Sequence, residues 1–324
     1  MTKKENALRI LRFDNPERVV SDAPCHWLAY TGCNHETIDG GGGHGSPVGT
    51  HWTDIWGTGW VREQEGVMGF PRTNPLAEME NLENYTWPDP DDERICGKIY
   101  DLKKQFQGGD CFLAGSHRDT LWEKSYMLAG MENMMVWLHN ESGHARKILS
   151  GIMDFQLGIA KHYLSLGIEW AGLGDDLGTQ HSLLMGVEVL REFFFPEYKR
   201  LFDLYKKNGV VVSFHSCGHV EPVLEMFMEL GVNCLNPVQA TANNLARVRK
   251  TTQGRMALAG GVSTGLVMKG PVGEIKTAVR DAIHLLGRDG GYFCGPDQGM
   301  PFPPEHLAAF REAVAKFGTY PFKN

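Results

Sequence analysis

The chain has 324 residues, of which 42% are hydrophobic and 22% charged, the balance of an ordinary soluble globular protein with a large core. Its formal net charge is -7 and no segment is dense in lysine or arginine, so nucleic acid is not an expected partner. No apolar run approaches the roughly 18 residues of a membrane helix, and the charged first residues do not resemble a signal peptide. We therefore expect a cytoplasmic protein without membrane contact.

The first hundred residues predict a few short elements around an irregular segment. We expect a helix over 4–13 and a strand over 19–26. Residues 31–60 are rich in glycine and tryptophan, and we expect them to form an irregular extension that covers a ligand. The apolar stretch 65–70 is expected to be a further strand, followed by a helix at about 92–107.

From residue 110 onward, apolar strand-like stretches alternate with helix-like ones. The expected strands are 110–115, 169–174, 210–216, 233–238, 256–260 and 291–294; the expected helices are 121–140, 141–166, 183–207, 220–230, 245–251, 272–286 and 305–317. This alternation favours a parallel sheet with right-handed crossovers. Together with 19–26 and 65–70 there are eight strands, the number that closes a (β/α)8 barrel.

We therefore predict an α/β fold, a (β/α)8 TIM barrel, as a single domain over 1–324 with an irregular N-terminal extension. A doubly wound open sheet is the alternative. It is weakened because no G-x-G-x-x-G segment follows the first expected strand.

Polar, glycine-flanked segments follow five consecutive expected strands. They begin at Gly174, His215, Asn236, Gly260 and Cys294. In a barrel, the catalytic side chains lie on the rim where strands end, so this rim is the expected active site. The alternative is that loop polarity has gathered there by chance.

His215 and Cys217 are the sharpest pair on this rim. Residues two apart on a strand point to the same side, so both side chains can reach one centre. Cys294 ends the last expected strand, and strand tips converge across a barrel's mouth. One imidazole and two thiolates suit Zn²⁺, with a fourth position open for substrate or water. The alternative is a core histidine and buried thiols, since the seven scattered cysteines also suit a reduced protein without disulfides.

Several segments resemble the uroporphyrinogen decarboxylase superfamily. They are residues 215–225, 231–239, 260–262, 174–180, 195–199, 8–18 and 54–57, so the resemblance extends over nearly the whole chain. It implies a (β/α)8 barrel. The true decarboxylases carry an arginine-rich N-terminal motif that binds porphyrin carboxylates, but residues 20–60 contain no arginine. The resemblance therefore favours the cobalamin-dependent methyltransferase branch, in which many members bind zinc by a pattern that His215, Cys217 and Cys294 match.

Within that branch, the resemblance implies a zinc ion that acts as a Lewis acid in methyl transfer to or from a corrinoid protein. Aromatic residues flank the segment 31–60, namely Trp27, Tyr30, Trp52, Trp56 and Trp60. They suit a flat ring, so we expect a methoxylated aromatic substrate and an O-demethylase component. A methylcobamide:coenzyme M methyltransferase is the nearest alternative. It would need a cation for a sulfonate, and Arg62 and Arg118 are available. A metal-free decarboxylase or lyase and a non-catalytic module that docks a corrinoid protein also stay open.

The expected site residues follow from these placements. The zinc ligands are His215, Cys217 and Cys294, while the expected catalytic residues are Asp175, Asp176 and His215. Substrate contacts are expected from His26, Trp52, Trp56, Gln180, Gln239 and Asp297. Helix capping is the alternative for one of the two aspartates, and packing under a loop is the alternative for the tryptophans. No D-x-H-x-x-G segment occurs, so methylcobamide is expected on a partner corrinoid protein, and a homodimer is compatible with this interpretation.

Overall fold

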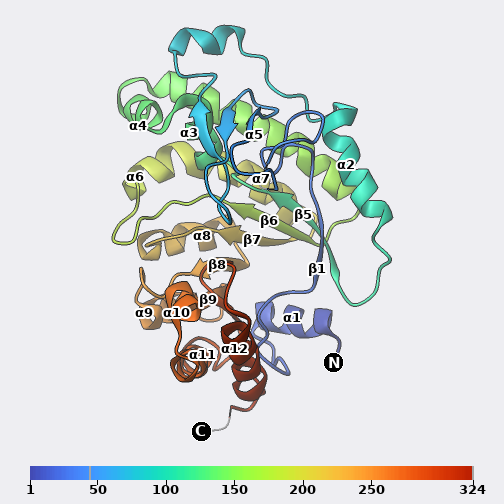
Figure 1. The fold of residues 1–324 in the computed structure, drawn as a ribbon, viewed down its shortest axis with the longest axis vertical. Helices are drawn as coiled ribbons and strands as arrows, with labels where there is room; N and C mark the ends of the chain where they lie inside the picture. The colour runs from blue at the N-terminus through green and yellow to red at the C-terminus, as the bar shows by residue number, and fades with distance from the viewer. Residues whose placement is uncertain (44, 323–324) are drawn as a thin grey trace.

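The computed structural model of the chain describes residues 1–43 and 45–322. Seven parallel strands form one curled sheet in the order β1-β5-β6-β7-β8-β9-β10 (Figure 1). The strands are β1 (Cys25–Leu28), β5 (Phe112–His117), β6 (Trp170–Gly174), β7 (Val211–His215), β8 (Cys234–Val238), β9 (Ala257–Val262) and β10 (Tyr292–Pro296). From β5 onward, the strand order in space follows the order in sequence, as expected when a helix returns the chain to the start of the next strand.

The two ends of this sheet meet at the segment before β1. Val20 forms an isolated parallel bridge with Phe293 of β10, and the Cys294 amide donates to the Val20 carbonyl at 2.9 Å. A few residues later, Cys25 begins the pairing with β5. The expected strand 19–26 is therefore divided between the two ends of the sheet. The α/β architecture is confirmed, and the described residues place seven strands in the parallel sheet.

The strand predicted at 65–70 is wrong as a member of the parallel sheet. Its last residue, Phe70, opens a strand of a separate antiparallel sheet of order β2-β3-β4, and Gly66, with a φ of 73°, lies in a turn. That sheet consists of β2 (His51–Thr53), β3 (Gly59–Val61) and β4 (Phe70–Thr73). The error arises because a short apolar run has no periodicity that distinguishes a core strand from a loop and an edge strand.

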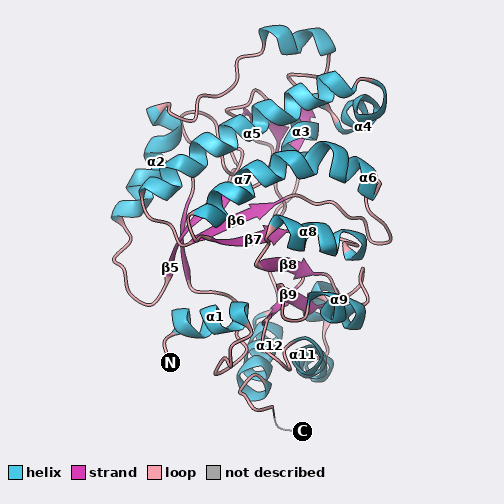
Figure 2. Ribbon diagram, turned by 180° about the vertical axis from the view of Figure 1, so that it is seen from behind, coloured by secondary structure: helices cyan, strands magenta, loops and turns pink. Residues whose placement is uncertain are grey.

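Helices surround the curled sheet, as Figures 1 and 2 show from opposite sides. They are α1 (Lys3–Arg12), α2 (Glu93–Lys104), α3 (Trp122–Ala129), α4 (Met131–Asn140), α5 (Ser142–Ser165), α6 (Val187–Val189), α7 (Phe195–Lys207), α8 (Leu224–Leu230), α9 (Leu245–Thr252), α10 (Thr264–Lys269), α11 (Val272–Leu286) and α12 (Pro304–Phe317). There are also two short 3₁₀ helices, η1 (Met79–Asn84) and η3 (Glu221–Val223), and a π-helix, η2 (Leu190–Phe194). The helix predicted over 121–140 is divided into α3 and α4 at Gly130, whose φ is 88°. Among the described helices, none has both the length and the apolar character needed to cross a membrane.

Successive residues of each strand contribute to two different cores. The larger core lies between the sheet and the helices and includes Phe214, Leu258 and Cys294. The smaller core lies inside the curled sheet, where Phe293 packs with residues of other strands and with Ile10 of α1. This smaller core does not fill the interior, and a cavity of about 860 Å³ is left inside the sheet. Barrel interiors are ordinarily filled by side chains, so this space is available for a ligand.

Candidate active site

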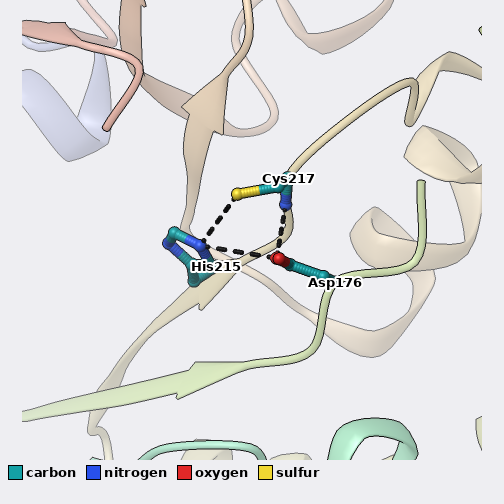
Figure 3. A group of neighbouring side chains, drawn as sticks. All are labelled: Asp176, His215 and Cys217. Carbon is teal, nitrogen blue, oxygen red and sulfur yellow. Dashed lines mark hydrogen bonds and ion pairs between the residues drawn. The ribbon is translucent and has the colours of Figure 1, made fainter. Parts of the chain in front are cut away.

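Three side chains of types that can bind a metal ion, Asp176, His215 and Cys217, meet where β6 and β7 end (Figure 3). His215 Nε2 lies 3.3 Å from Cys217 Sγ and 3.5 Å from Asp176 Oδ1. The three donor atoms all lie within 4.8 Å of one another. Tetrahedral zinc ligands bound at about 2.0–2.3 Å are themselves about 3.3–3.7 Å apart. The donor set and its spacing therefore fit a zinc ion.

Neighbouring residues hold this group in an orientation suited to a metal. Asn236 is paired with His215 in the β7–β8 register, and its Oδ1 lies 2.9 Å from His215 Nδ1. When Nδ1 donates its hydrogen to Asn236, the lone pair of Nε2 is left for the metal. The amide of Cys217 donates to Asp176 Oδ1 at 2.8 Å. The backbone thus fixes the aspartate beside the histidine.

Burial and mutual contacts shift the pKa values of Asp176, His215 and Cys217. Burial alone would raise the pKa of Asp176, but His215 and the Cys217 amide outweigh burial and hold it below its ordinary value. Burial works against protonation of His215, yet Asp176 and Asn236 together raise its pKa. Burial, and then the charge of Asp176, raise the pKa of the Cys217 thiol well above its ordinary value. A metal ion must therefore displace protons from the histidine and the thiol.

The structure does not bring the third predicted ligand, Cys294, to this group. Phe293 lines the cavity, whereas its neighbours Tyr292 and Cys294 belong to the core between sheet and helices. The Cys294 side chain is fully buried there, and burial raises the pKa of its thiol to about 12. The structure thus places Asp176, and not Cys294, beside His215 and Cys217. The reason is strand alternation, since a one-residue difference reverses the face to which a side chain points.

Gln298, four residues beyond Cys294, reaches the group from the end of β10. Its side-chain amide makes a close contact with Cys217 Sγ, and it also lines the cavity. Its backbone amide donates to Thr264 Oγ1 at 2.7 Å, which ties the β10 loop to the start of α10. Gln298 therefore lies beside the donor group, where a substrate or fourth ligand would approach.

Asp175, predicted to be catalytic, holds the start of α3 instead of facing the cavity. It is fully buried and accepts hydrogen bonds from the amides of Leu121 and Glu123 at 2.9 and 2.8 Å. The Tyr198 hydroxyl donates to it at 2.6 Å. Burial raises the pKa of Asp175. The helix-capping alternative therefore describes this residue, although the helix is α3 and not the next one in sequence.

The cavity extends from the donor group into the interior of the curled sheet. Trp27, Trp170 and Phe293 line its apolar side. Trp27 is 45% exposed although it lies on a strand, because it points into this open space. A Cβ atom on Gly172 would lie 2.8 Å from the Trp27 ring, so the ring rests against the glycine. This geometry suits a flat apolar ligand.

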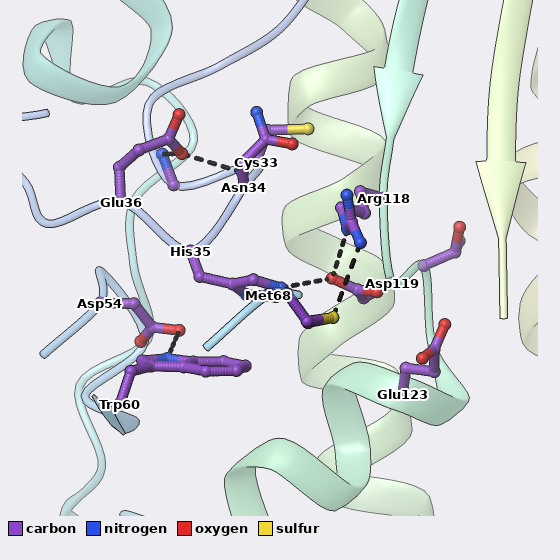
Figure 4. Close-up of polar contacts among 12 residues, drawn as sticks. Cys33, Asn34, His35, Glu36, Asp54, Trp60, Met68, Arg118, Asp119 and Glu123 are labelled. Carbon is purple, nitrogen blue, oxygen red and sulfur yellow. Dashed lines mark hydrogen bonds and ion pairs between the residues drawn. The ribbon is translucent and has the colours of Figure 1, made fainter. Parts of the chain in front are cut away.

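The polar side of the cavity is built from the end of β5, the start of α3 and loops of the N-terminal region (Figure 4). Its lining includes Asn34, Met68, Arg118, Asp119 and Glu123. Burial, and then the neighbouring aspartates, raise the pKa of Glu123. Glu123 lies in the first turn of α3.

Three of the predicted substrate contacts lie away from the cavity. His26 Nε2 lies 3.0 Å from the Leu102 carbonyl, because His26 points outward from β1 toward α2. The Trp52 indole donates to the His35 carbonyl at 2.6 Å and stacks on Trp60. Trp56 is buried with Phe155 in the outer core. Packing under the N-terminal loops, the alternative for these tryptophans, is what the structure shows.

The remaining predicted contacts hold the rim together. Gln239 Nε2 donates to Gln180 Oε1 at 3.1 Å, and Gln239 Oε1 accepts from the Gly218 amide at 2.9 Å. Asp297 is buried, and its Oδ2 accepts from the Ala240 amide at 3.2 Å. Burial raises the pKa of Asp297 to about 7. None of these three side chains lines the main cavity.

Sequence reasoning missed two contributors to the site. Asn236 was recognised only as a polar strand-end residue, and its place beside His215 depends on the register of β8. Met68 comes from a loop that was predicted to be a strand, and the sequence has no local signal for its contact with the cavity.

Comparison with known proteins gives a consistent assignment. Residues 64–317 match the family described as Uroporphyrinogen decarboxylase (URO-D). A methylated-thiol--coenzyme M methyltransferase from Methanosarcina mazei is 26% identical over 262 residues, which span 75% of this chain but only 64% of that protein. A solved methyltransferase from Methanosarcina mazei has the same overall fold, with a TM-score of 0.73 at 16% identity, covering 98% of this chain and 99% of the other. Since the family match extends over most of the chain, the protein belongs to the uroporphyrinogen decarboxylase family.

Proposed function

We propose that this chain is a methyltransferase that binds zinc through Asp176, His215 and Cys217. It moves a methyl group between a small substrate, for which a methoxylated aromatic compound is the best candidate, and a partner corrinoid protein. The observation that carries the proposal is the donor group at the edge of an open cavity with aromatic walls. The methyltransferase relatives support the reaction class.

In the demethylation direction, the bond between the methyl carbon and the ether oxygen breaks and its electron pair stays on oxygen. The methyl carbon forms a new bond with the electron pair of Co(I) on the corrinoid, and the released phenolate takes a proton from solvent. A zinc ion held by the three side chains would supply a Lewis acid that favours departure of the oxygen. Trp27 and Phe293 would hold the ring and exclude water from the reacting methyl group.

Methyl transfer from a methylated thiol is the second candidate, favoured by the reaction named for the relative from Methanosarcina mazei. A thiol or thioether sulfur would take the place of the ether oxygen beside the same donor group. Porphyrinogen decarboxylation has less support, because Arg118 is the only lysine or arginine among the described residues that line the cavity. One guanidinium is a poor match for a substrate with many carboxylates.

The test combines metal analysis with a methyl-transfer assay. Purified protein is mixed with a corrinoid protein in the Co(I) state and with methoxyarenes or methylated thiols, while formation of methyl-Co(III) is followed by absorbance. We expect about one zinc ion per chain. His215→Ala should lose both zinc and activity, whereas His181→Ala, at an exposed position of the rim, should keep both. A metal-free wild type with full activity would contradict the proposal.

A further inference from the structure

Arg118 is placed to recognise one particular class of substrate. It follows β5 directly and lines the same cavity as His215. Asp176, Trp27 and Phe293 line the same cavity, so Arg118 shares this space with two members of the donor group and with the aromatic wall. A ligand that fills this cavity therefore meets both Arg118 and His215.

The Arg118 guanidinium has hydrogen-bonding capacity left over. A guanidinium carries five N–H donors, and the contacts described for this one are weak. Its Nη2 lies 3.7 Å from Met68 Sδ, and its Nε is 3.6 Å from Asp119 Oδ2 and has no hydrogen-bond partner among the described residues. Asp119 Oδ2 lies closer to His35 Nε2, at 2.9 Å. Arg118 is thus oriented by its neighbours without being saturated by them.

The nearby carboxylate of Glu123 is already engaged. Its Oε1 accepts from the Tyr126 hydroxyl and its Oε2 from the Asp176 amide, both at 3.2 Å. Among the described residues, Asp119 and not Glu123 is the carboxylate that forms an ion pair with Arg118. The cavity combines one incompletely paired cation with an aromatic wall formed by Trp27.

We infer that the cavity binds a small anionic substrate whose carboxylate or sulfonate pairs with Arg118 while its methyl-bearing or methyl-accepting end lies at Asp176, His215 and Cys217. This inference rests on the proposed function and specifies its substrate class. A methoxybenzoate would supply the anion from the methyl donor, and a mercaptoalkanesulfonate would supply it from a thiol acceptor. Both present the planar or threefold oxygen arrangement that a guanidinium binds with paired hydrogen bonds.

The experiment measures equilibrium binding to the purified protein by calorimetry, and the zinc content of the same preparation is determined. The probes are 3-methoxybenzoate, its neutral analogue 3-methoxybenzyl alcohol, and 2-mercaptoethanesulfonate. Arg118→Gln should weaken binding of at least one anion by about 10–100-fold, because a charge-assisted contact is lost, and should change binding of the neutral probe less than about twofold. Arg118→Lys should retain part of the affinity. Arg146→Gln, at an exposed pair with Glu192, is the matched control and should have no effect.

The outcomes separate the inference from the proposed function. If binding of 3-methoxybenzoate depends on Arg118, the anionic substrate is the methyl donor. If binding of 2-mercaptoethanesulfonate depends on Arg118, the anionic substrate is a thiol that accepts the methyl group. Equal weakening of the anionic and neutral probes would overturn the inference, because it would show a structural role for Arg118. Demethylation of neutral methoxyarenes with no Arg118-dependent anion binding would also overturn it, while leaving the proposed function intact. Arg118-dependent binding in a protein that lacks both zinc and methyl transfer would support the inference and overturn the proposed function.

Discussion

The ends of β7 and β10 carry similar residues but face different parts of the molecule. His215 at the end of β7 points into the curled sheet, and Cys217 just beyond it reaches the same space. Cys294 on β10 points into the core between sheet and helices. A cysteine at a strand end is therefore a candidate ligand only when it lies on the inward face. Because successive side chains of a strand point to opposite faces, a shift of one position moves a cysteine from the cavity to the outer core.

The largest expected effect tests this comparison directly. Cys217→Ala should abolish stoichiometric zinc and reduce methyl transfer by about 100-fold or more, since the contribution of a Lewis acid is several kcal/mol. Cys294→Ala removes a similar thiol from the outer core and should keep zinc, with a loss of stability only. Metal content and turnover of the two variants are the measurements. Loss of zinc from a folded Cys294→Ala variant would contradict the assignment of Cys294 to the outer core.

Asn236 tests the comparison of β7 with β10 further, because it contacts His215 at the end of β7. Asn236→Ala removes the group that orients His215 and should weaken zinc affinity by about 10–100-fold. Asn243→Ala is a useful control, since Asn243 binds the backbone of the same rim through Gly218 but does not touch the histidine. Competition with a chromophoric chelator would give both affinities. Equal losses in the two variants would show that general loosening of the rim, and not orientation of His215, is responsible.

The direction in which a strand residue points also distinguishes two histidines at strand ends, His215 on β7 and His117 on β5. His117 ends β5 but is buried among Gln156 and Tyr205, on α5 and α7, and burial lowers its pKa to about 4. A histidine with a depressed pKa contributes stability that is complete above its unfolded pKa of about 6.5 and is lost as the pH falls toward 4. When the pH falls from 7 to 5, protonation of His117 in the unfolded state should lower the free energy of unfolding by about 2 kcal/mol.

Urea unfolding at the two pH values measures this contribution. His117→Gln has no imidazole to titrate, so its unfolding free energy should depend less on pH than that of the wild type. The assignment to His117 fails if both proteins lose the same amount between pH 7 and pH 5.

The smallest expected effect concerns Trp27 and His26, neighbouring residues of β1 that point to opposite faces of the sheet. Trp27 points into the cavity and the adjacent His26 points outward. Trp27→Ala should raise the KM for an aromatic substrate by about 5–10-fold with a smaller change in kcat, since a stacking contact with the ring is lost. His26→Ala should leave KM unchanged. A larger effect from His26 than from Trp27 would reverse the assigned faces of β1.

The second half of the fold could be predicted from the sequence because its strands are short, apolar and evenly separated by helices. The predicted strand 169–174 corresponds to β6 (Trp170–Gly174), and 233–238 corresponds to β8 (Cys234–Val238). The proximity of His215 and Cys217 could be predicted because it depends only on neighbouring positions. The face of Cys294 could not, since a strand that is buried on both sides has no polar alternation to identify its inward residues.

The N-terminal region resisted prediction for a different reason. Its tryptophans are scattered through loops and short strands, so their sequence spacing contains no periodicity. Trp52 and Trp60 stack on each other in the small antiparallel sheet, and only a known fold could separate them from Trp27. Of the aromatic residues expected around the ligand, Trp27 does line the cavity, whereas Trp52 and Trp56 pack elsewhere.

The closure of the curled sheet has a consequence for the order of folding. Segments near the two ends of the described chain meet where the sheet closes. Val20 bridges Phe293, Arg18 bridges Thr319, and the Val19 amide donates to the Gly318 carbonyl at 2.8 Å. Contacts between residues so far apart in sequence form late, because closing a long loop costs entropy before the contact stabilises it. During synthesis, β5 to β9 can associate while residues beyond 290 are still unmade. The enclosed cavity can therefore form only after β10 (Tyr292–Pro296) has been made and has joined the segment before β1.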